Sequence, residues 1–592
     1  MCGIFGYIGN RNDAGKLVIE GLKHLEYRGY DSWGIAIKEE GNSILLEKDI
    51  GKISEVDSNN FTMQSNLAIA HTRWATHGGV TKENAHPHIC EDCSIAVVHN
   101  GIIENYEELR EELKQKGYDF KSQTDSEVIP HLIQEELKNT NDFAQAVRSA
   151  CKRFKGRYGL LAMDLNSKTL VAARTGSPLI IGVKKDTGYF IASDIPAFME
   201  HTKVVQYLDD GEMVVTNGES ILFTDIETGE EHPKREIEIT WSIEKAQKGE
   251  FDHFMLKEIM EQKDSIARAV NQNEQQIKKL GEAIRNSKGT FLVGCGTAHK
   301  ACMVAEYFFS VVAQEHVNVT SAGEFKLYNH FLTSESLLIV VSQSGETADV
   351  LEAMKIAKSK GAKVLAIINS EGSTIAREAD DTLLINAGPE RAVASTKALT
   401  GQMAVLMLIA YSMKNKLKEG KMLLLETTSL INDMLNPRYI KFIEEVAENM
   451  KDESDLYIIG KSWNFPMALE SAIKIQEVSY VHAEGFAGSE LKHGPIALVE
   501  KGTPCITLAG DDEIFPDIIS NTIELKARGA NTIGVSPIQS DAFDTWIKVP
   551  NAGVAQAIVN IIPIQVLAYY LAVKRGMNPD MPRNLAKSVT VK

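Results

Sequence analysis

The chain is poor in cysteine, in net positive charge and in uninterrupted apolar sequence. Its 592 residues include seven cysteines, a sparse and odd number that suits a reducing cytoplasm better than a disulfide framework. The net charge of -17 argues against binding to nucleic acid or to an anionic membrane. We expect no signal peptide. The longest apolar stretch, residues 552–573, contains Gln556, Asn560, Pro563 and Gln565, which predicts a buried core helix rather than a membrane span.

The remaining composition is that of a globular α/β protein with several domains. Hydrophobic residues make up 44% and charged residues 24%, and the length predicts three or four domains. Residues 2–220 alternate short β-rich runs with turns and with helical patterns at 106–115 and 126–137. This predicts a layered α+β domain of the αββα type, rich in antiparallel strands and ending in a hairpin at Asn217-Gly218. Residues 221–285 predict a linker with connecting helices.

The second half of the chain is predicted to be a duplication. Residues 289–294 are echoed by 455–460, and residues 361–367 by 529–535, at offsets of 166 and 168 residues. Each copy alternates strand, glycine-rich turn and helix, which predicts two doubly wound, mostly parallel sheets. We place these two domains at 286–425 and 445–582, and a short tail at 583–592.

Cys2 is a candidate nucleophile because of its position. Removal of Met1 would leave a thiol and a free α-amine on one Cα, and the amine's unperturbed pKa near 8 lets it accept the thiol proton. The alternative is an ordinary small buried cysteine at the start of a strand.

Polar residues further along the first domain would complete an acyl-transfer site. Asn100 and the backbone N–H of Gly101 are candidate donors to an oxyanion. Arg73 offers a planar fork for a carboxylate, with a surface salt bridge as the alternative. Asp125 is placed to hold an ammonium, with a simple helix cap as the alternative.

Together these motifs resemble the N-terminal-nucleophile glutamine amidotransferase domain, over about residues 2–220. The resemblance implies that a cysteine attacks the side-chain amide of L-glutamine, forms a thioester and releases ammonia. The resemblance implies that Cys2 is both nucleophile and base and that Asn100 and Gly101 form the oxyanion hole. It also implies that Arg73 and Asp125 bind the glutamine and that the site is lined by Trp74, Thr76 and His77.

His86, His88, Cys90 and Cys93 offer an alternative zinc site, since their types and spacing suit zinc. The segment Asn84–His88, however, matches one that serves the amidotransferase fold without metal. We therefore expect no metal and no cofactor.

The first copy of the duplication carries a candidate phosphate site. An apolar strand at 337–341 runs directly into Ser342-Gln343-Ser344-Gly345-Glu346-Thr347 and then a helix, so hydroxyls and free N–H groups meet at a helix N-terminus. The spacing is not that of a P-loop, and a serine-rich cap is the alternative reading. The turn at 294–298 also follows a strand, where such sheets bind ligands.

This unit resembles sugar isomerase domains, which bind phosphosugars. Further matches occur at 393–397, 477–480, 490–495 and 582–591. A glutaminase, two such domains and this tail together resemble the glutamine–fructose-6-phosphate aminotransferase family, whose substrates are L-glutamine and fructose 6-phosphate. In the sugar half, the resemblance implies that Lys587 forms a Schiff base, that Glu477, near Lys474, shuttles a proton, and that His493 assists ring opening. It implies that the phosphate and the sugar are bound by Thr297, Ser342, Gln343, Ser344, Thr347, Val393, Ser395 and Ala586.

The resemblance further implies a cytoplasmic homodimer in which His493 is shared between the subunits. It places the reaction at the first step of amino-sugar biosynthesis, and it implies that ammonia passes inside the protein through a gate at Trp74.

Two alternatives to this function remain. Ala298 stands where the family often has serine, and Lys300 follows, so an aminotransferase for another ketose phosphate is one alternative. A non-catalytic sugar-phosphate sensor is a second alternative, which the intact set of candidate residues argues against. Other glutaminase-fused synthetases lack support, because their pyrophosphatase and phosphoribosyltransferase loops are absent from the sequence.

Overall fold

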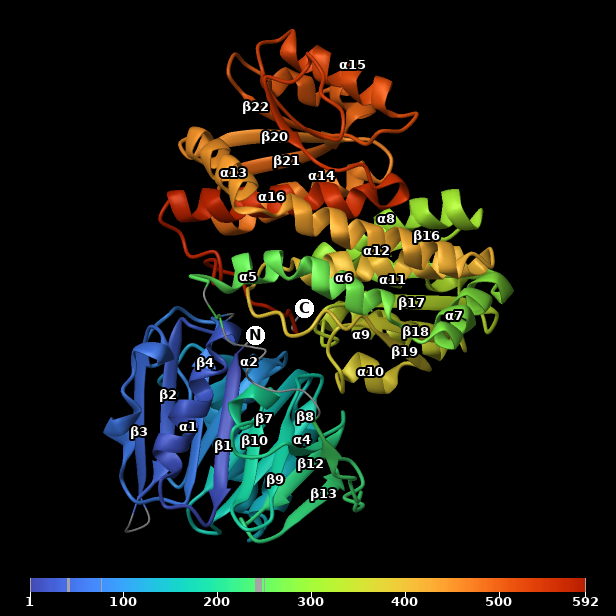
Figure 1. Ribbon diagram of the computed structural model, residues 1–592. Coiled ribbons are helices and arrows are strands. Elements are labelled where there is room, and N and C mark those ends of the chain that lie inside the picture. Colours follow the sequence, from blue (N-terminus) through green and yellow to red (C-terminus); the bar gives the residue numbers. More distant parts are fainter. Residues whose placement is uncertain (1, 40–42, 76, 240–247, 250, 591–592) are drawn as a thin grey trace. The chain divides into compact units, whose positions relative to one another are not determined.

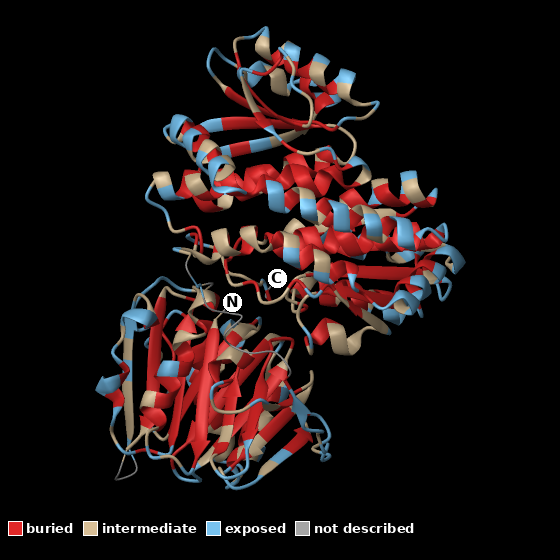
Figure 2. Ribbon diagram, viewed as in Figure 1, coloured by how far each residue is buried: buried red, intermediate tan, exposed pale blue. Residues whose placement is uncertain are grey.

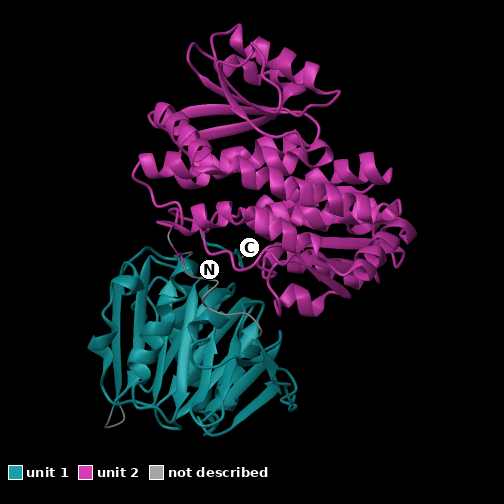
Figure 3. Cartoon of the chain, viewed as in Figure 1, with its two compact units in different colours: residues 1–247, 586–592 teal, residues 248–585 magenta. Residues whose placement is uncertain are grey.

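The computed structural model describes residues 2–39, 43–75, 77–239, 248–249 and 251–590. The chain forms two compact units, residues 1–247 together with 586–592, and residues 248–585 (Figure 3). We call them unit 1 and unit 2 and describe each by itself.

Unit 1 contains two largely antiparallel sheets (Figure 1). The 8-stranded sheet has the order β14-β11-β9-β10-β1-β4-β2-β3 and the 6-stranded sheet the order β13-β12-β8-β7-β6-β5. The strands are β1 (Gly3–Gly9), β2 (Ser32–Lys38), β3 (Ile44–Ile50), β4 (Leu67–Arg73), β5 (His88–Ile89), β6 (Ile95–Ile103), β7 (Gly156–Asp164), β8 (Thr169–Thr175), β9 (Ile180–Lys184), β10 (Gly188–Ala192), β11 (Val204–Tyr207), β12 (Glu212–Thr216), β13 (Ile221–Asp225) and β14 (Ile237–Glu238).

An apolar core lies between the two sheets, and a helical layer covers the outer face of each. One outer core packs α1 (Ala14–Lys23) on the first sheet, and the other packs α2 (Tyr106–Gln115), α3 (Val128–Leu137) and α4 (Phe143–Arg153) on the second. This is the αββα layering that the sequence predicts. The predicted helix at 126–137 is an α-helix only from Val128, because Asp125–Glu127 forms a 3₁₀ turn.

The central strand β1 sets the position of the N-terminus. All seven of its residues are buried, since one face meets the second sheet and the other meets α1 (Figure 2). A Cβ at Gly6 would come 2.4 Å from Leu161 Cδ2, so glycine allows the two sheets to approach here. β1 pairs with β4 from Gly3 opposite Thr72, which brings Cys2 beside the end of β4.

Unit 2 contains two 5-stranded parallel sheets with the same connectivity, as the duplication predicts. The first has the order β16-β15-β17-β18-β19 and the second β21-β20-β22-β23-β24. The strands are β15 (Gly289–Gly294), β16 (Asn318–Ser321), β17 (Ser336–Ser342), β18 (Lys363–Ile368), β19 (Asp381–Leu384), β20 (Asp455–Gly460), β21 (His482–Ala487), β22 (Pro504–Leu508), β23 (Asn531–Ser536) and β24 (Thr545–Lys548).

Helices cover both faces of these sheets. Along β15, Phe291 and Val293 enter one core and Leu292 the other, which is the period of two of a strand buried on both sides. The helices are α5 (Phe254–Met260), α6 (Gln262–Val270), α7 (Glu274–Asn286), α8 (Gly296–Phe308), α9 (Ala348–Ser359), α10 (Thr374–Glu378), α11 (Lys397–Met413), α12 (Leu417–Met434), α13 (Pro437–Met450), α14 (Asn464–Ser479), α15 (Phe515–Lys526) and α16 (Gln556–Lys574).

The apolar stretch near the C-terminus forms α16 together with a preceding 3₁₀ turn. Among the described residues it is the one helix that is long and apolar enough to cross a membrane. However, 89% of its apolar segment is buried inside the protein. Gln556 donates to Asn560 Oδ1 at 2.8 Å, and Asn560 donates to Asn464 Oδ1 at 2.9 Å. The side chains of Gln556 and Asn560 thus find hydrogen-bond partners within the core, as in a core helix.

Candidate active sites

Cys2 directly precedes β1 and lies next to Trp74, the first residue after β4. The backbone N–H of Trp74 donates to Cys2 Sγ at 3.2 Å, and the thiol faces Trp74 O at 3.5 Å. Burial raises the pKa of the Cys2 thiol, while the Trp74 N–H and the charge of Arg73 act in the opposite direction. The thiolate therefore needs a nearby base to form at neutral pH.

Asn100 and Gly101 follow each other near the end of β6, and the side chain of Asn100 reaches Cys2. Asn100 is 2% exposed, and its Nδ2 donates to the Cys2 carbonyl oxygen at 2.9 Å. Gly101 has φ +119°, and a Cβ there would come 2.0 Å from Arg157 O, so this position requires glycine. The structure thus brings a hydrogen-bond donor side chain to the candidate nucleophile, as acyl-transfer chemistry needs.

Arg73 ends β4 and is 4% exposed. Its guanidinium donates to the carbonyl oxygens of His77, Gly78 and Gly79, with Nη1 3.0 Å from Gly79 O. Arg73 therefore shapes the loop that contains His77, and it is not the surface salt bridge of the alternative reading. Thr76, in the same loop, lies outside the described residues.

Asp125 begins the 3₁₀ turn before α3 and is 4% exposed. Its Oδ2 accepts the backbone N–H of Ile103 at 2.8 Å, which ties the turn to the end of β6 shortly after Gly101. The side chain of Asp125 therefore links two segments that are distant in the sequence and does not cap its own helix.

The residues of the alternative zinc site make other contacts. His88 Nε2 lies 3.1 Å from Thr124 Oγ1, the rings of His86 and His88 pack edge to face at 4.7 Å, and Cys90 donates to Asp92 Oδ1 at 2.9 Å. Cys93 is exposed. Within the described part of the chain, no three His, Cys, Asp or Glu side chains are grouped to hold a metal.

The candidate phosphate site of unit 2 lies between the C-terminal end of β17 and the N-terminus of α9. Ser342 Oγ accepts the N–H of Gly345 at 3.0 Å, and Ser344 Oγ accepts the N–H of Glu346 at 3.2 Å. Thr347 is the N-cap residue of α9 but makes no side-chain cap bond. The loop thus gathers hydroxyls and helix N–H groups, which is the arrangement that binds phosphate.

Gly345 gives this loop its shape. Its φ is +66°, and a Cβ there would come 2.0 Å from Ser373 Oγ. Glu346 holds the same loop from the other side, since its Oε2 accepts the hydroxyl of Thr374 at 2.7 Å.

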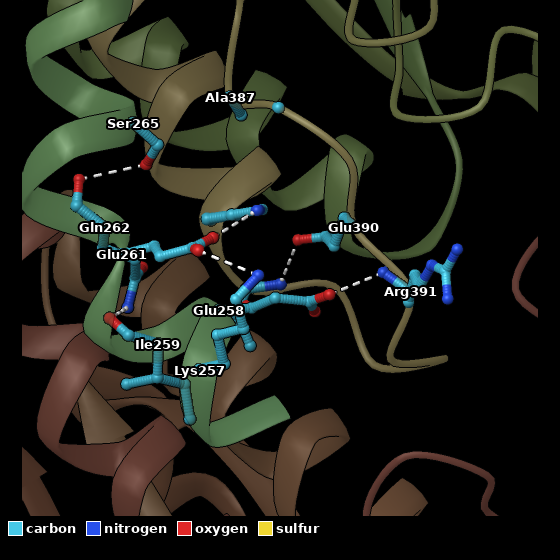
Figure 4. A network of polar contacts seen from close by, with 12 residues as sticks. Lys257, Glu258, Ile259, Glu261, Gln262, Ser265, Ala387, Glu390 and Arg391 are labelled. Atoms are coloured by element: carbon cyan, nitrogen blue, oxygen red, sulfur yellow. Dashed lines mark hydrogen bonds and ion pairs between the residues drawn. The ribbon is translucent and has the colours of Figure 1, made fainter. Parts of the chain in front are cut away.

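A second loop, residues 387–396, carries Val393 and Ser395 and is held by two carboxylates (Figure 4). Glu258 Oε1 accepts the N–H of Arg391 at 2.5 Å. Glu390 accepts the N–H groups of Thr396 and Ala398 and the hydroxyl of Ser395, the last at 2.9 Å. The Glu390 side chain thereby positions Ser395 and caps the start of α11.

A buried group of charges joins the two copies of the duplication. Lys474 on α14 is 1% exposed and pairs with Glu470 at 3.2 Å and with Glu477. Burial acts to lower the pKa of Lys474, but the two carboxylates outweigh burial and raise it. Thr297 on α8 donates to Glu470 Oε1 at 2.9 Å. Sequence analysis missed Glu470, although its spacing from Lys474 and Glu477 places all three on one helix face.

The unusual residues after Thr297 lie in different environments. Ala298 is 8% exposed and belongs to the apolar core on that side of the sheet. Lys300 is half-buried; burial lowers its pKa, and the nearby charge of Glu470 opposes the shift. The ammonium of Lys300 thus lies close to the buried charges of Lys474, Glu470 and Glu477, which we call the Lys474 cluster.

The remaining candidate residues lie near the C-terminus and on the second copy. His493 is exposed at the end of the 3₁₀ turn Gly488–His493, and its side chain makes no hydrogen bond or ion pair within the described chain. Asp580 caps α5 through the N–H groups of Phe254 and Met255, and Arg583 N–H donates to the Tyr480 hydroxyl at 2.8 Å. Ala586 and Lys587 follow directly after this anchored segment.

The two halves of this arrangement correspond to known families. The glutamine amidotransferase domain model matches residues 71–200, and the SIS domain model, named for sugar isomerases, matches residues 283–412 and 449–575. The fold and the sites therefore define a glutamine amidotransferase joined to two sugar isomerase domains, which confirms the predicted fold class.

Full-length relatives identify the family. Glutamine–fructose-6-phosphate aminotransferases (isomerizing) of Pyrococcus horikoshii and Thermococcus kodakarensis are 44% and 42% identical to this chain, over 100% of each chain. The C-terminal domain of the aminotransferase from Francisella tularensis aligns with a TM-score of 0.53 and 30% identity, over 56% of this chain and 99% of that one. The chain belongs to the glutamine–fructose-6-phosphate aminotransferase (isomerizing) family.

Proposed function

We propose that the protein converts L-glutamine and fructose 6-phosphate into glutamate and glucosamine 6-phosphate, the first step of amino-sugar biosynthesis. One observation carries the proposal: the chain combines a nucleophilic thiol beside amide donors with a Lys474–Glu477 pair in a phosphosugar fold. The two halves complement each other, because the first releases ammonia and the second binds a sugar whose carbonyl carbon ammonia can attack.

In the glutaminase half, Cys2 Sγ attacks the amide carbon of glutamine. The free α-amine of Cys2, once Met1 is removed, takes the thiol proton and returns it to the departing ammonia. Asn100 Nδ2 and Gly101 N–H stabilise the oxyanion, and water then hydrolyses the thioester to glutamate. Arg73 and Asp125 hold the α-carboxylate and α-amine of the substrate, with Thr76 and His77 beside them. The short distances around Cys2 support this assignment.

In the isomerase half, the loop formed by Ser342, Gln343, Ser344 and Thr347 holds the phosphate. The loop with Val393 and Ser395, together with Thr297 and Ala586, closes around the sugar. Lys587 forms the Schiff base with the open-chain ketose and is displaced by ammonia. Glu477, with Lys474 beside it, moves a proton from carbon 1 to carbon 2, which converts ketose into aldose.

Ammonia passes between the two centres inside the protein, with Trp74 as its gate. Ammonium, the dominant form at neutral pH, has no lone pair to attack a carbon, so a closed path that excludes water preserves the reactive form. The backbone of Trp74 already touches the Cys2 thiol, which supports a role for this residue where ammonia is released.

We further propose a cytoplasmic homodimer in which His493 of each chain serves the partner's sugar site during ring opening. His493 is exposed and has no side-chain partner in its own described chain. Leu327 and Phe331, exposed by 73% and 68% on the 3₁₀ helix Ala322–Phe331, offer apolar surface for such an interface. The sparse cysteines support the cytoplasm.

The decisive experiment mixes the purified protein with glutamine and fructose 6-phosphate and measures glutamate and glucosamine 6-phosphate by mass spectrometry. Equimolar formation of both products supports the proposal; an unchanged ketose, or amination of another ketose phosphate from a panel, contradicts it. Lys587→Ala should stop amino-sugar formation while glutamine hydrolysis continues. If this variant still makes the amino sugar, the imine role of Lys587 is wrong.

A further inference from the structure

We propose that His71 is a positioning residue that determines which end of the Asn100 side-chain amide faces the reaction centre. The inference rests on the proposed glutaminase function of Cys2 and deepens it. It concerns a histidine that lies in the middle of a buried strand and that none of the proposed steps uses.

The contacts of His71 fix the position of its proton. Nε2 lies 3.1 Å from Asn100 Oδ1 and 3.1 Å from the carbonyl oxygen of His99. The carbonyl oxygen is an acceptor only, so Nε2 carries the hydrogen. The amide atom of Asn100 that faces this N–H must then be its oxygen, because an NH₂ group there would set donor against donor.

The environment keeps His71 in this single state. The side chain is fully buried, and burial lowers its pKa to about 3, so the ring is neutral at physiological pH. Nδ1 is buried and has no hydrogen-bond partner within the described residues. The ring stacks on His86 with centroids 4.2 Å apart and an interplanar angle of 16°, which restricts its rotation.

The chemical consequence lies at the other end of the amide. With Oδ1 held by His71, Nδ2 points toward Cys2 and donates to its carbonyl oxygen at 2.9 Å. The two ends of an asparagine amide have almost the same shape but opposite hydrogen-bonding character. A flipped Asn100 would direct an oxygen at the negative oxygen of the tetrahedral intermediate, so a donor would be lost and a repulsion gained.

His71 thus acts on catalysis through Asn100. The three other histidines that lie nearby have partners of their own: His86 Nδ1 accepts the N–H of His99 at 3.2 Å, His99 Nδ1 lies 2.8 Å from Ser126 Oγ, and His88 Nε2 lies 3.1 Å from Thr124 Oγ1. In the described part of the chain, His71 supplies the ring N–H that reaches the Asn100 amide.

A matched pair of variants tests the inference. His71→Gln places an amide nitrogen close to the position of the ring Nε2 and can donate to Asn100, whereas the shorter His71→Asn places its nitrogen near Nδ1 and cannot reach. Both are neutral amides of similar polarity. We expect His71→Asn to lower kcat for glutamine hydrolysis by about 10- to 100-fold with KM changed less than about threefold, and His71→Gln to retain most of kcat.

Substitution of Asn100 supplies the second arm. If His71 acts through Asn100, His71→Asn should cause little further loss in an Asn100→Ala background. Equal activity of the two His71 variants, or an undiminished loss in the Asn100→Ala background, would overturn the inference. Histidine ¹⁵N NMR of the whole protein gives a readout that needs no activity: a neutral Nε2–H ring at pH 6 is expected, and an Nδ1–H or protonated ring would also overturn it.

The same data separate this inference from the function on which it rests. Glutamine hydrolysis that is absent in the native protein, or that survives Cys2→Ala, contradicts the glutaminase assignment and the inference with it. Hydrolysis that depends on Cys2 but is unaffected by His71→Asn contradicts the role of His71 alone.

Discussion

Thr297 of the first isomerase copy donates its hydroxyl to Glu470 of the second copy, with 2.9 Å between the two oxygens. Because Glu470 also pairs with Lys474, the charged centre of unit 2 is built from both copies rather than from one. In the proposed reaction the two copies therefore have different tasks: the first copy supplies the phosphate loop, and the second supplies the acid–base residues.

Glu470→Gln should weaken the sugar reaction without affecting glutamine hydrolysis. The substitution keeps the shape and the contact with Thr297 but removes one of the two negative charges that hold the Lys474 ammonium. We expect kcat for glucosamine 6-phosphate formation to fall by about tenfold or more, since positioned acid–base groups contribute about 10²- to 10⁴-fold. Glu335→Gln, which removes an exposed carboxylate that pairs with Lys288, serves as the control. Equal amino-sugar kcat in the two variants would contradict the role of Glu470.

Gly345→Ala should raise KM for fructose 6-phosphate by about tenfold or more. Alanine strains the positive φ, and its Cβ would meet Ser373 Oγ, so the phosphate loop must open. Gly289→Ala is the control, because nothing lies within 4 Å of a Cβ there. Steady-state kinetics with varied sugar phosphate measures both. An unchanged KM in Gly345→Ala would show that the phosphate binds elsewhere.

Cys2→Ala should abolish glutamine hydrolysis but leave some conversion of fructose 6-phosphate to glucose 6-phosphate. The thiol belongs to unit 1, and the phosphate loop and the Lys474 cluster belong to unit 2. Cys93→Ser, which alters an exposed cysteine, should preserve both activities. Coupled assays for glutamate and for glucose 6-phosphate follow the two reactions. Simultaneous loss of both in Cys2→Ala would contradict the assignment of two separate centres.

Unit 1 should lose stability as the pH falls below about 6.5. Burial lowers the pKa values of His71, His86, His88 and His99, so the unfolded chain binds more protons than the native one, and unfolding becomes easier with acid. For His71, the pKa is about 3 in the native state and about 6.5 in the unfolded state, which corresponds to a contribution of about 5 kcal/mol to the free energy of unfolding. This contribution is fully present above pH 6.5 and is lost progressively toward pH 3.

Denaturant unfolding followed at several pH values between 4 and 8 measures this effect. His71→Gln should show a shallower dependence than the native protein, because glutamine does not titrate. Parallel curves for the two proteins would contradict a neutral His71 in the fold.

Mixed dimers should reveal whether His493 is shared. His493→Ala and Glu477→Ala should each abolish amino-sugar formation as pure proteins. If each site takes Glu477 from one chain and His493 from the other, co-refolded mixtures should recover up to about one quarter of native activity, because half of the chains enter mixed dimers and each mixed dimer has one intact site. Mixtures that remain inactive would place both residues in the same chain.

The sequence was informative where local pattern determines structure. The strand–glycine–helix alternation predicted both parallel sheets. The spacing of three between Lys474 and Glu477 predicted that both can face one pocket, and in the structure the two side chains form an ion pair. Glu470 was missed because its environment depends on Thr297, a residue 173 positions away, and no local pattern records that contact. The start of α3 at Val128 was misplaced because Asp125 is used by Ile103, on another element.

The most direct test of the central claim is an isotope competition. The protein is given glutamine labelled with ¹⁵N in the side-chain amide, together with fructose 6-phosphate and an excess of unlabelled ammonium, and the amino sugar is analysed by mass spectrometry. If ammonia passes internally from Cys2 to the sugar, the product carries ¹⁵N at nearly the enrichment of the glutamine. Dilution of the label to the level of the ammonium in solution would contradict the account.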